Sequence, residues 1–377
     1  MITTIILIYA LAGIVYCFLI GFFTIGWYKK PQKKAIYKTD YPFISVIIPF
    51  RNEAPNLNGL IQDLKSQNYP TERFEVLLSD DFSDDNSNNI IRHEILELEN
   101  FFLIPYDDKD DSGKKAAIER ALTHAKGDVI VFTDADCKMG YDWLKSIGNE
   151  FMDTGLQMLL APVDIEYSTK SIFKKLQSLE FLSLIGVTGG SANMSQPVMA
   201  NGANMAIRKK IMPDARKKMK GKNLLSGDDI FLLHAVKKLY PGKIRFLKSR
   251  KSIVKTKPSN SLKEFFSQRV RWSSKSSSYR DSFTVLSGSL VATVNIMIVI
   301  LVIGLIFYPL LLKPIVILWS FKLIADFLLI AGVAKFIGKI NLLWWYVPLQ
   351  VLYPFYVTIT LIMAVFTKTN WKNRIQN

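Results

Sequence analysis

The chain has 377 residues, of which 49% are hydrophobic, and a formal net charge of +16. This size and apolar content fit either two domains or one soluble domain with membrane segments. Two cysteines exclude a disulfide framework, and the three histidines show no metal-ligand spacing. Basic residues gather at Arg208–Lys222 and Lys237–Lys257 without a nucleic-acid-binding motif, which predicts no nucleic acid partner. Such clusters instead favour anionic membrane lipids or an anionic substrate.

An apolar run at Ile5–Trp27 is long enough to span a membrane. The run has no small-residue cleavage site, which favours an anchor over a removed signal peptide. Lysines crowd the segment Lys29–Lys34, and this positive charge places the next segment in the cytoplasm. We therefore predict an integral protein of a bacterial-type inner or plasma membrane, with an anchor over residues 1–28 and a cytoplasmic domain after it.

Strands and helices alternate through the next hundred residues. Apolar runs predict strands at Phe43–Pro49, Phe74–Ser79, Phe101–Ile104 and Asp128–Phe132, and helical spacing predicts helices at Asn56–Asn68, Asn86–Glu97 and Lys114–Ala125. This alternation indicates an α/β fold with a parallel sheet and right-handed crossovers. The dinucleotide fingerprint Gly-x-Gly-x-x-Gly does not occur.

The second half of the soluble part is less regular. We expect a strand at Leu156–Asp164, an amphipathic helix at Ile172–Ile185 with Lys174, Lys175 and Glu180 on its polar side, a loop from Gly189 to Gly202, and a helix at Ile230–Val236 with Ser226 or Asp228 as its N-cap. The segment Ser261–Ser274 interleaves Leu262, Phe265, Phe266 and Trp272 with Lys263, Arg269 and Arg271. This pattern predicts an amphipathic helix at the membrane interface.

Beyond Phe283 the chain is apolar. Three spans are predicted at Val285–Leu312, Ile315–Val333 and Leu342–Phe366, separated by Lys313-Pro314 and Lys335–Asn341. Lys322 and Asp326 lie four residues apart inside the second span, and we interpret them as a mutually neutralising structural pair. The whole chain is thus divided into an anchor (1–28), a catalytic domain (40–260), an interface helix (261–282) and membrane helices (283–368).

Two carboxylates, Asp134 and Asp136, follow the apolar strand Asp128–Phe132. Just past a strand end, this i, i+2 spacing lets both groups reach one ion, and carboxylates suit hard cations such as Mg²⁺ or Mn²⁺. The carboxyl end of a strand in an open α/β sheet is also where ligands bind. A plain surface turn is the alternative, because Asp is common in turns.

Four features occur in order along the chain: Asp80-Asp81 after one strand, Asp134-x-Asp136 after another, Asp228-Asp229 before a helix, and Gln268-x-x-Arg271-Trp272. This order resembles the membrane-bound family 2 glycosyltransferases, such as cellulose, hyaluronan and ceramide glucosyl synthases. The resemblance covers about Ser45–Trp272. It implies a GT-A fold, a Rossmann-like domain that binds nucleotide-diphospho-sugars, beside transmembrane helices.

The resemblance also implies a donor site. Pro49, Arg51, Asn52 and Glu53 match the Pro-x-x-Asn-Glu loop beside the nucleotide, Asp80 and Asp81 match the element that contacts base or ribose, and Lys115 matches a lysine that meets the nucleotide. Glu119 or Arg120 stands where the family often has Asn, which weakens that last match. Asp134 and Asp136 match the metal-binding Asp-x-Asp, so Mg²⁺ or Mn²⁺ is the implied cofactor.

On the acceptor side, Asp229 matches the general base, and Asp228 replaces the usual Glu before it. Gln268, Arg271 and Trp272 match Gln-x-x-Arg-Trp, where Arg can pair with a diphosphate and Trp can stack on a sugar. Asn201 and Gly202 fall where the family lines the acceptor side. Helix capping is the alternative for Asp228-Asp229, although a capping residue can also be a base. An interfacial helix with ordinary Arg and Trp anchors is the alternative for Arg271 and Trp272.

The sequence thus predicts an inverting glycosyltransferase that moves sugar from a nucleotide sugar, with uridine the commonest nucleotide of the family, to a lipid-linked or glycan acceptor. The small number of predicted spans argues against a wide secretion channel, so processive polysaccharide synthesis is the second choice. Two other classes are open: a non-catalytic nucleotide-binding scaffold in the membrane, and a transporter subunit with a regulatory domain. Complete motifs disfavour the scaffold, and the scarcity of intramembrane charges disfavours the transporter.

Overall fold

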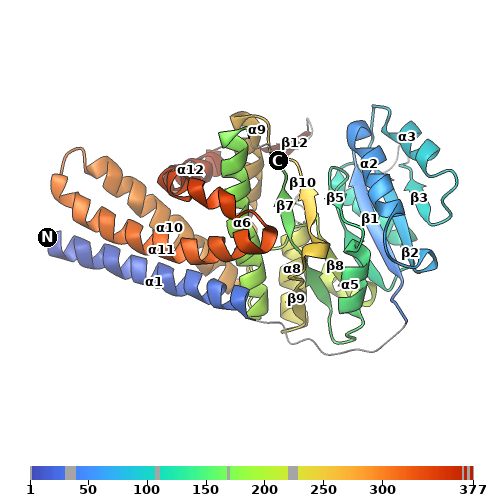
Figure 1. Cartoon of the computed structure of the whole chain (residues 1–377), viewed down its shortest axis with the longest axis horizontal. Helices are drawn as coiled ribbons and strands as arrows, with labels where there is room; N and C mark the ends of the chain where they lie inside the picture. The colour runs from blue at the N-terminus through green and yellow to red at the C-terminus, as the bar shows by residue number, and fades with distance from the viewer. Residues whose placement is uncertain are drawn as a thin grey trace. The chain divides into compact units, whose positions relative to one another are not determined.

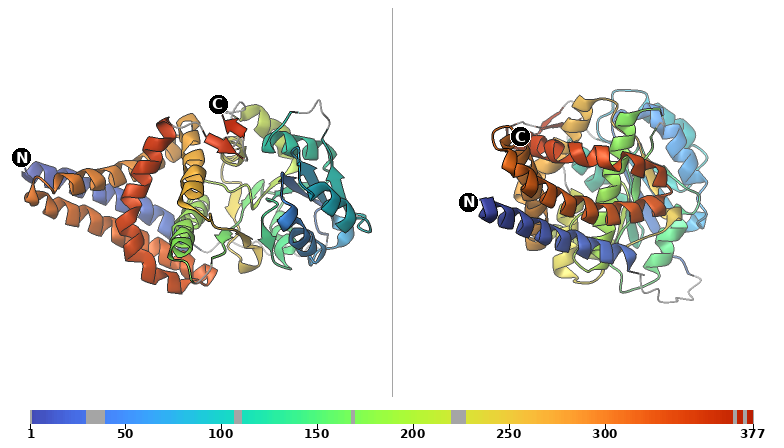
Figure 2. Two further views of the ribbon diagram at one scale, coloured as in Figure 1. Left: turned by 90° about the horizontal axis from the view of Figure 1, so that it is seen from above. Right: turned by 60° about the vertical axis from the view of Figure 1, so that its left-hand side comes forward.

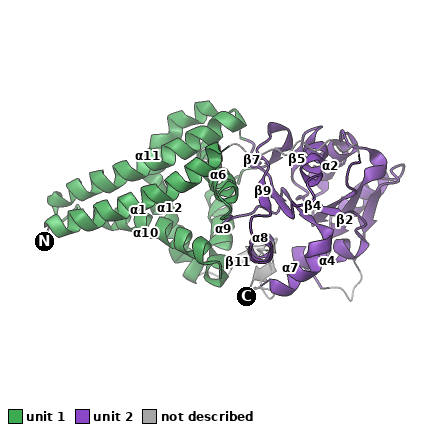
Figure 3. Ribbon diagram, turned by 90° about the horizontal axis from the view of Figure 1, so that it is seen from below, with its two compact units in different colours: residues 1–29, 167–196, 258–377 green, residues 30–166, 197–257 purple. Residues whose placement is uncertain are grey.

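The structure, a computed structural model, describes residues 2–29, 40–106, 111–167, 170–219, 228–366, 369–371 and 374–376. The chain folds into two compact units, coloured separately in Figure 3. Unit 1 comprises residues 1–29, 167–196 and 258–377, and unit 2 comprises residues 30–166 and 197–257. These boundaries do not coincide with the four predicted ranges, because residues 167–196 group with the long apolar helices.

Within its described residues, unit 2 is built on a seven-stranded sheet of order β3-β2-β1-β4-β8-β6-β9 (Figure 1). The strands are β1 (Ile44–Phe50), β2 (Phe74–Asp80), β3 (Phe101–Ile104), β4 (Val129–Phe132), β6 (Met158–Leu160), β8 (Met205–Arg208) and β9 (Ile244–Phe246). Strands β3, β2, β1 and β4 are parallel, as the sequence predicts. Strand β8 runs antiparallel to both β4 and β6, so the complete sheet is mixed.

The central strands form because their residues are apolar on both faces. Every residue of β1, β2 and β4 is buried, and helices cover the sheet. The helices of unit 2 are α2 (Ala54–Lys65), α3 (Ser87–Glu94), α4 (Lys114–His124), α5 (Trp143–Phe151), α7 (Met212–Lys218) and α8 (Asp228–Leu239). Helix α2 turns its apolar stripe, including Leu57, Leu60 and Leu64, inward.

The single strand predicted at Leu156–Asp164 is instead two strands. It is split at Pro162 into β6 and β7 (Val163–Ile165), which belong to different sheets. Proline has no backbone N–H to donate to a strand ladder, so a strand interior is unfavourable there. Strand β7 joins β5 (Lys138–Met139) and β10 (Val254–Thr256) in a three-stranded sheet, in the order β5-β10-β7.

Unit 1 consists mainly of long helices. They are α1 (Ile2–Tyr28), α6 (Ile172–Asn193), α9 (Leu262–Ser273), α10 (Ser282–Gly304), α11 (Leu312–Ile337) and α12 (Tyr346–Phe366). The short strands β11 (Thr369–Trp371) and β12 (Arg374–Gln376) pair antiparallel. Helices α1, α10 and α11 lie side by side (Figure 2). Among the described residues, four helices are long and apolar enough to cross a membrane: Thr3–Tyr28, Ser282–Gly304, Pro309–Ile337 and Ile340–Phe366.

Two predicted helix ends in this region are wrong. The first C-terminal span was expected to reach Leu312, but α10 ends at Gly304. Lys313-Pro314 was expected to separate two spans, but both residues lie in the first turn of α11. Proline is tolerated there because first-turn N–H groups have no helical partner. The other break is confirmed, since α11 ends at Ile337 and is followed by Gly338, whose φ of 89° is readily adopted only by glycine.

Helix α6 is longer than predicted because its glycines serve helix packing. The prediction of a loop from Gly189 is wrong for residues 189–193, which continue the helix. A Cβ atom on Gly190 would lie 2.1 Å from the carbonyl oxygen of Phe23, and one on Gly26 would lie 2.1 Å from that of Gly190. Small residues at these positions let the backbones of α1 and α6 approach closely, as in membrane helix pairs.

Helix α9 confirms the predicted amphipathic segment and begins at the N-cap Ser261, whose Oγ accepts a hydrogen bond from Glu264 N. Its polar face is not as predicted. Arg269 is 3% exposed, and its partner Glu180, expected on the polar side of its own helix, is 4% exposed. The two form a buried ion pair, so both predictions of a solvated charge are corrected.

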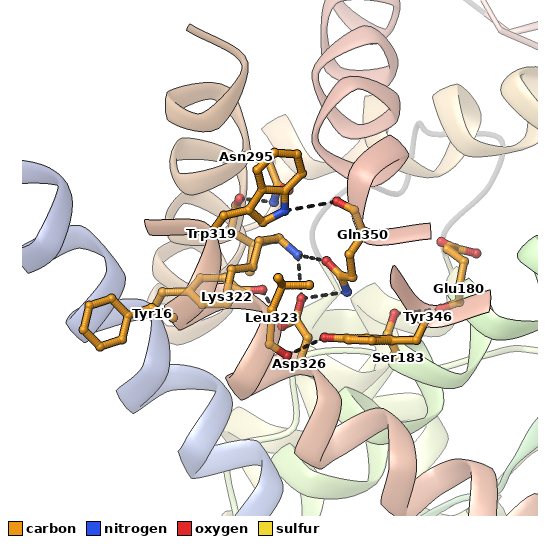
Figure 4. Close-up of polar contacts among 12 residues, drawn as sticks. Tyr16, Glu180, Ser183, Asn295, Trp319, Lys322, Leu323, Asp326, Tyr346 and Gln350 are labelled. Carbon is orange, nitrogen blue, oxygen red and sulfur yellow. Dashed lines mark hydrogen bonds and ion pairs between the residues drawn. The ribbon is translucent and has the colours of Figure 1, made fainter. Parts of the chain in front are cut away.

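A second buried polar cluster joins three apolar helices (Figure 4). Lys322 Nζ contacts Asp326 Oδ2 at 2.5 Å and donates to Gln350 Oε1 at 2.6 Å. Gln350 Nε2 donates to Asp326 Oδ2, and Tyr16 Oη donates to Asp326 Oδ1 at 2.7 Å. The predicted structural pair is therefore confirmed as a contact, and it ties α1 and α12 to α11.

Candidate functional site

The predicted donor residues follow the carboxyl ends of neighbouring parallel strands in unit 2. Strand β1 ends at Phe50, which pairs with Asp80 at the end of β2, and β4 ends beside β1 at Phe132. The loops that leave these ends therefore meet at one edge of the sheet, which is where ligands bind in open α/β sheets.

The loops after β1 and β2 are held together by hydrogen bonds. Asn52, with a φ of 52°, donates from Nδ2 to Asp84 Oδ1 at 2.7 Å and accepts from Asp84 N at 3.0 Å. Its backbone N–H donates to Ser83 Oγ. The N–H of Glu53 donates to Ser87 Oγ at 2.9 Å. The Asn of the predicted Pro-x-x-Asn-Glu loop thus braces the loop after β2.

Asp80 and Asp81 have different partners. The Asp80 carboxylate is buried and accepts from the N–H and hydroxyl of Ser83 and from Asn88 Nδ2. Asp81 Oδ1 accepts from the N–H of Gly113, the residue before α4, at 2.5 Å. Asp80 therefore stabilises its own loop, while Asp81 binds Gly113 at the start of α4.

The Asp-x-Asp carboxylates follow β4 and carry concentrated negative charge. Lys114 Nζ forms an ion pair with Asp134. Asp136 Oδ2 accepts from Thr256 Oγ1 at 3.2 Å. Burial, reinforced by the carboxylates of Asp134 and Glu53, raises the pKa of Asp136. Because Gly113 binds Asp81 and Lys114 binds Asp134, the N-terminus of α4 brings the two predicted carboxylate elements together.

Lys114 is a residue that sequence reasoning missed. The prediction assigned the nucleotide contact to Lys115, whereas the ammonium group paired with Asp134 belongs to Lys114. Both residues begin α4, and the role of Lys115 stays a prediction. Adjacent lysines at a helix start point in different directions, so only the helix register, which the sequence does not give, distinguishes them.

The donor set suits a divalent cation. Across the described ranges, no group of three or more His, Cys, Asp or Glu side chains could hold a metal by itself. Mg²⁺ is commonly bound by one or two carboxylates together with substrate phosphates, and Asp134 with Asp136 would supply those two. The Lys114 ammonium already places a positive charge against Asp134, which shows that this carboxylate accepts a cation. Burial and the nearby carboxylates raise the pKa of the Cys137 thiol, so it stays protonated.

The predicted base, Asp229, lies at the start of α8. Its Oδ2 accepts from Gly202 N at 3.1 Å, and its Oδ1 accepts from Ile230 N at 2.9 Å. Asn201, next to Gly202, accepts from Ala203 N and so tightens the same turn. The structure therefore brings together Asn201, Gly202 and Asp229. The side chain of Asp228 and all of Ser226 lie outside the described residues.

Gln268, Arg271 and Trp272 lie on α9, which belongs to unit 1. The Trp272 ring packs against Phe181 with ring centroids 6.4 Å apart. Gln268 Oε1 accepts from Arg269 Nη1 at 2.5 Å. Arg269 lies between Gln268 and Arg271 in the sequence, and its contacts with the motif residues were not predicted. The predicted site residues thus fall in both units.

Comparison with known proteins identifies the domain. The model named Glycosyl transferase family 2 matches residues 45–214, a little under half of the chain. Glycosyltransferase AglE of Haloferax volcanii is 31% identical over 126 residues, covering 33% of this chain and 41% of AglE. A beta-monoglucosyldiacylglycerol synthase of Trichormus variabilis is 27% identical over 103 residues, covering 27% of this chain and 22% of the synthase. The chain therefore matches about two fifths or less of the length of these relatives.

The fold has a solved counterpart. The structure of mannosyltransferase PcManGT from Pyrobaculum calidifontis, in complex with GDP-Man and Mn²⁺, has a TM-score of 0.57 to this chain at 17% sequence identity. The match covers 97% of this chain and 99% of that one, and it shows a shared GT-A-like fold. Residues 45–214 thus form a glycosyltransferase domain of family 2, in a chain whose described part also holds four helices able to cross a membrane.

Proposed function

We propose that this protein is a membrane-anchored, inverting glycosyltransferase that moves a sugar from a nucleotide sugar to a lipid-linked or short glycan acceptor. The observation that carries the proposal is the grouping of Asp81, Asp134 and Asp136 around the start of α4 in a family 2 glycosyltransferase domain. One relative is named as a synthase of a glucosylated diacylglycerol, which supports a lipid acceptor.

The donor would bind at the edge of the sheet. In this proposal Pro49, Arg51, Asn52 and Glu53 line the nucleotide, together with Asp80, Asp81 and Lys115. The hydrogen bonds of the Asp80 carboxylate keep that loop in place. A nucleoside diphosphate brings negative charge, and the ammonium groups at the start of α4 would attract it.

Asp134 and Asp136 would hold Mg²⁺ or Mn²⁺, which when bound offsets the charge of a leaving diphosphate. The neighbouring solved structure was determined with Mn²⁺, which supports the same use here. On donor binding, the Lys114 ammonium is expected to leave Asp134 for a phosphate oxygen. Phosphate oxygens bind ammonium groups, just as carboxylate oxygens do.

The chemical step is a displacement at the anomeric carbon. The acceptor hydroxyl oxygen forms the new bond, the bond to the diphosphate oxygen breaks, and the hydroxyl proton passes to the Asp229 carboxylate. A sugar or lipid hydroxyl is a poor nucleophile until that proton is removed in the transition state. Hydrogen bonds from Gly202 and Ile230 fix the orientation of the Asp229 carboxylate. Attack from the face opposite the leaving group inverts the anomeric configuration.

The lysines after α1 support a cytoplasmic catalytic domain, because positively charged flanks remain on that side. Gln268, Arg271 and Trp272 would serve the diphosphate and the acceptor sugar.

Transfer to lipid tests this function directly. Purified detergent-solubilised protein is incubated with radiolabelled UDP- and GDP-sugars, Mn²⁺ and a membrane lipid extract. We expect one donor to label a product that partitions into organic solvent. Label that appears only in a water-soluble polymer would contradict the lipid acceptor, and no label in any fraction would contradict the enzyme.

A further inference from the structure

The guanidinium of Arg269 is buried in unit 1 at the centre of the predicted Gln-x-x-Arg-Trp segment. It lies over the rings of Trp272 at 4.3 Å and Phe265 at 4.7 Å, measured from the guanidinium carbon to each ring centroid. Its Nη1 donates to Gln268 Oε1 at 2.5 Å. One buried cation therefore touches two of the three side chains that the family resemblance assigns to the substrate.

The charge of Arg269 is balanced from another helix. Its Nη2 donates to Glu180 Oε2 of α6 at 2.6 Å, with both side chains almost fully buried. Glu180 Oε1 accepts from Tyr356 Oη of α12 at 3.4 Å. Figure 4 shows Glu180 on α6 beside α12. The ion pair thus attaches α9 to α6, which packs against α1. The hydrogen bond of Glu180 attaches both helices to α12, which could span a membrane.

This attachment links the motif helix to the polar cluster of Figure 4. The Tyr356 ring packs against Tyr353 with centroids 5.6 Å apart, and Lys322 Nζ lies 4.7 Å from the centroid of the Tyr353 ring. A continuous series of contacts therefore runs from Lys322 through Tyr353, Tyr356 and Glu180 to Arg269. Every member lies in unit 1.

A buried charge is retained at this place despite its desolvation cost. An interface helix that needed only to lie on lipid would place its arginine in water, as the amphipathic pattern predicts. Here Arg269 is buried, and its planar guanidinium presents its N–H donors in fixed directions. Buried and hydrogen-bonded, such a group admits few alternative geometries.

We propose that Arg269 and Glu180 are positioning residues that fix Gln268 and Trp272 for the transfer reaction. The inference rests on the proposed function for its purpose, though not for the contacts. It also sets the chemistry of Gln268. Arginine has only donors, so it must face the amide oxygen of Gln268, and the Nε2 hydrogens are left to bind an oxygen of the acceptor.

Fluorine NMR tests the positioning without any need for catalysis. The chain is labelled with 5-fluorotryptophan, and the Trp272 resonance is assigned among the seven tryptophans by its loss in Trp272→Phe. Glu180→Gln and Arg269→Lys should each shift or broaden this resonance, because the cation over the ring moves. The matched control is Glu150→Gln, the same chemical change in a carboxylate that pairs with Arg245 in unit 2, outside this series of contacts. It should leave the resonance unchanged.

The kinetic arm uses the same variants. Glu180→Gln and Arg269→Lys should lower kcat for transfer by about tenfold or more while the KM for the nucleotide sugar is unchanged, since misplaced acceptor groups cost rate rather than donor binding. Glu180→Asp, which keeps the charge, should recover part of the rate. A Trp272 resonance that does not respond to Glu180→Gln or Arg269→Lys would overturn the inference. A response equal to that of Glu150→Gln would overturn it as well.

The two arms keep the inference separate from the proposed function. Absence of transfer in the wild-type protein would overturn the function, and the Trp272 resonance would still test the positioning. A shifted resonance with unchanged kcat would overturn the positioning role while the enzyme stands. If either variant fails to fold, the more conservative Glu180→Asp is measured in both arms, and an unmoved resonance with unchanged kcat in that variant counts against the proposal.

Discussion

Replacing Asp229 by asparagine is expected to lower the rate of sugar transfer by about 10²–10⁴-fold, the range of a general base. The asparagine oxygen can still accept from Gly202 N at the start of α8. The amide cannot take a proton from the acceptor hydroxyl, however. Its other end carries donors that face the N–H of Ile230, so one short-range hydrogen bond is lost as well. The measurement is single-turnover transfer from the preferred nucleotide sugar.

The comparison variant is Asp214→Asn, which makes the same chemical change at an exposed position in the first turn of α7. It should retain wild-type transfer. Donor binding should be unchanged in Asp229→Asn, because the donor residues lie at the strand ends. Wild-type transfer by Asp229→Asn would refute Asp229 as the base. A loss of donor binding would show that the residue serves the donor instead.

Replacing Lys322 by methionine is expected to destabilise the helices of unit 1 by about 3–5 kcal/mol, the cost of leaving a buried charge without its partner. Lys322 is fully buried, and Asp326 would then keep only neutral partners, the Tyr16 hydroxyl and the Gln350 amide. Thermal unfolding of the detergent-solubilised wild type and variant measures this loss of stability.

A double variant separates loss of charge from loss of volume. Lys322→Met with Asp326→Leu removes both charges, so it should recover much of the stability that the single change loses, as apolar replacements of buried pairs do. Leu328→Met, an exposed position on the same helix, should behave like the wild type. Equal destabilisation by the single and double variants would contradict the neutralising pair.

The central strands of unit 2 could be predicted from the sequence because they are buried on both faces. The runs Phe43–Pro49 and Asp128–Phe132 are almost continuously apolar, and the structure places β1 and β4 there with ends that differ by at most one residue. The carboxylates after β2 and β4 could be located for the same reason, because a parallel sheet brings its carboxyl ends to one edge.

Other features depend on contacts between distant segments. Gly189 and Gly190 have the composition of a loop, yet they lie in α6, and Gly190 packs closely against the backbone of α1. Arg269 and Glu180 have the spacing of solvated charges. They are nevertheless buried against each other, although 89 residues separate them in the sequence. The choice of Lys114 over its neighbour depends on the register of α4. Periodicity within one segment contains none of this information.

Metal-dependent release of a nucleoside diphosphate tests the central claim most directly. Wild-type protein, Asp136→Asn and Asp214→Asn are each given the preferred nucleotide sugar with Mn²⁺ or with EDTA. We predict release by the wild type and by Asp214→Asn in Mn²⁺, no release in EDTA, and none by Asp136→Asn under either condition. Release that is the same with EDTA, or that persists in Asp136→Asn, would contradict a donor site built on Asp134 and Asp136.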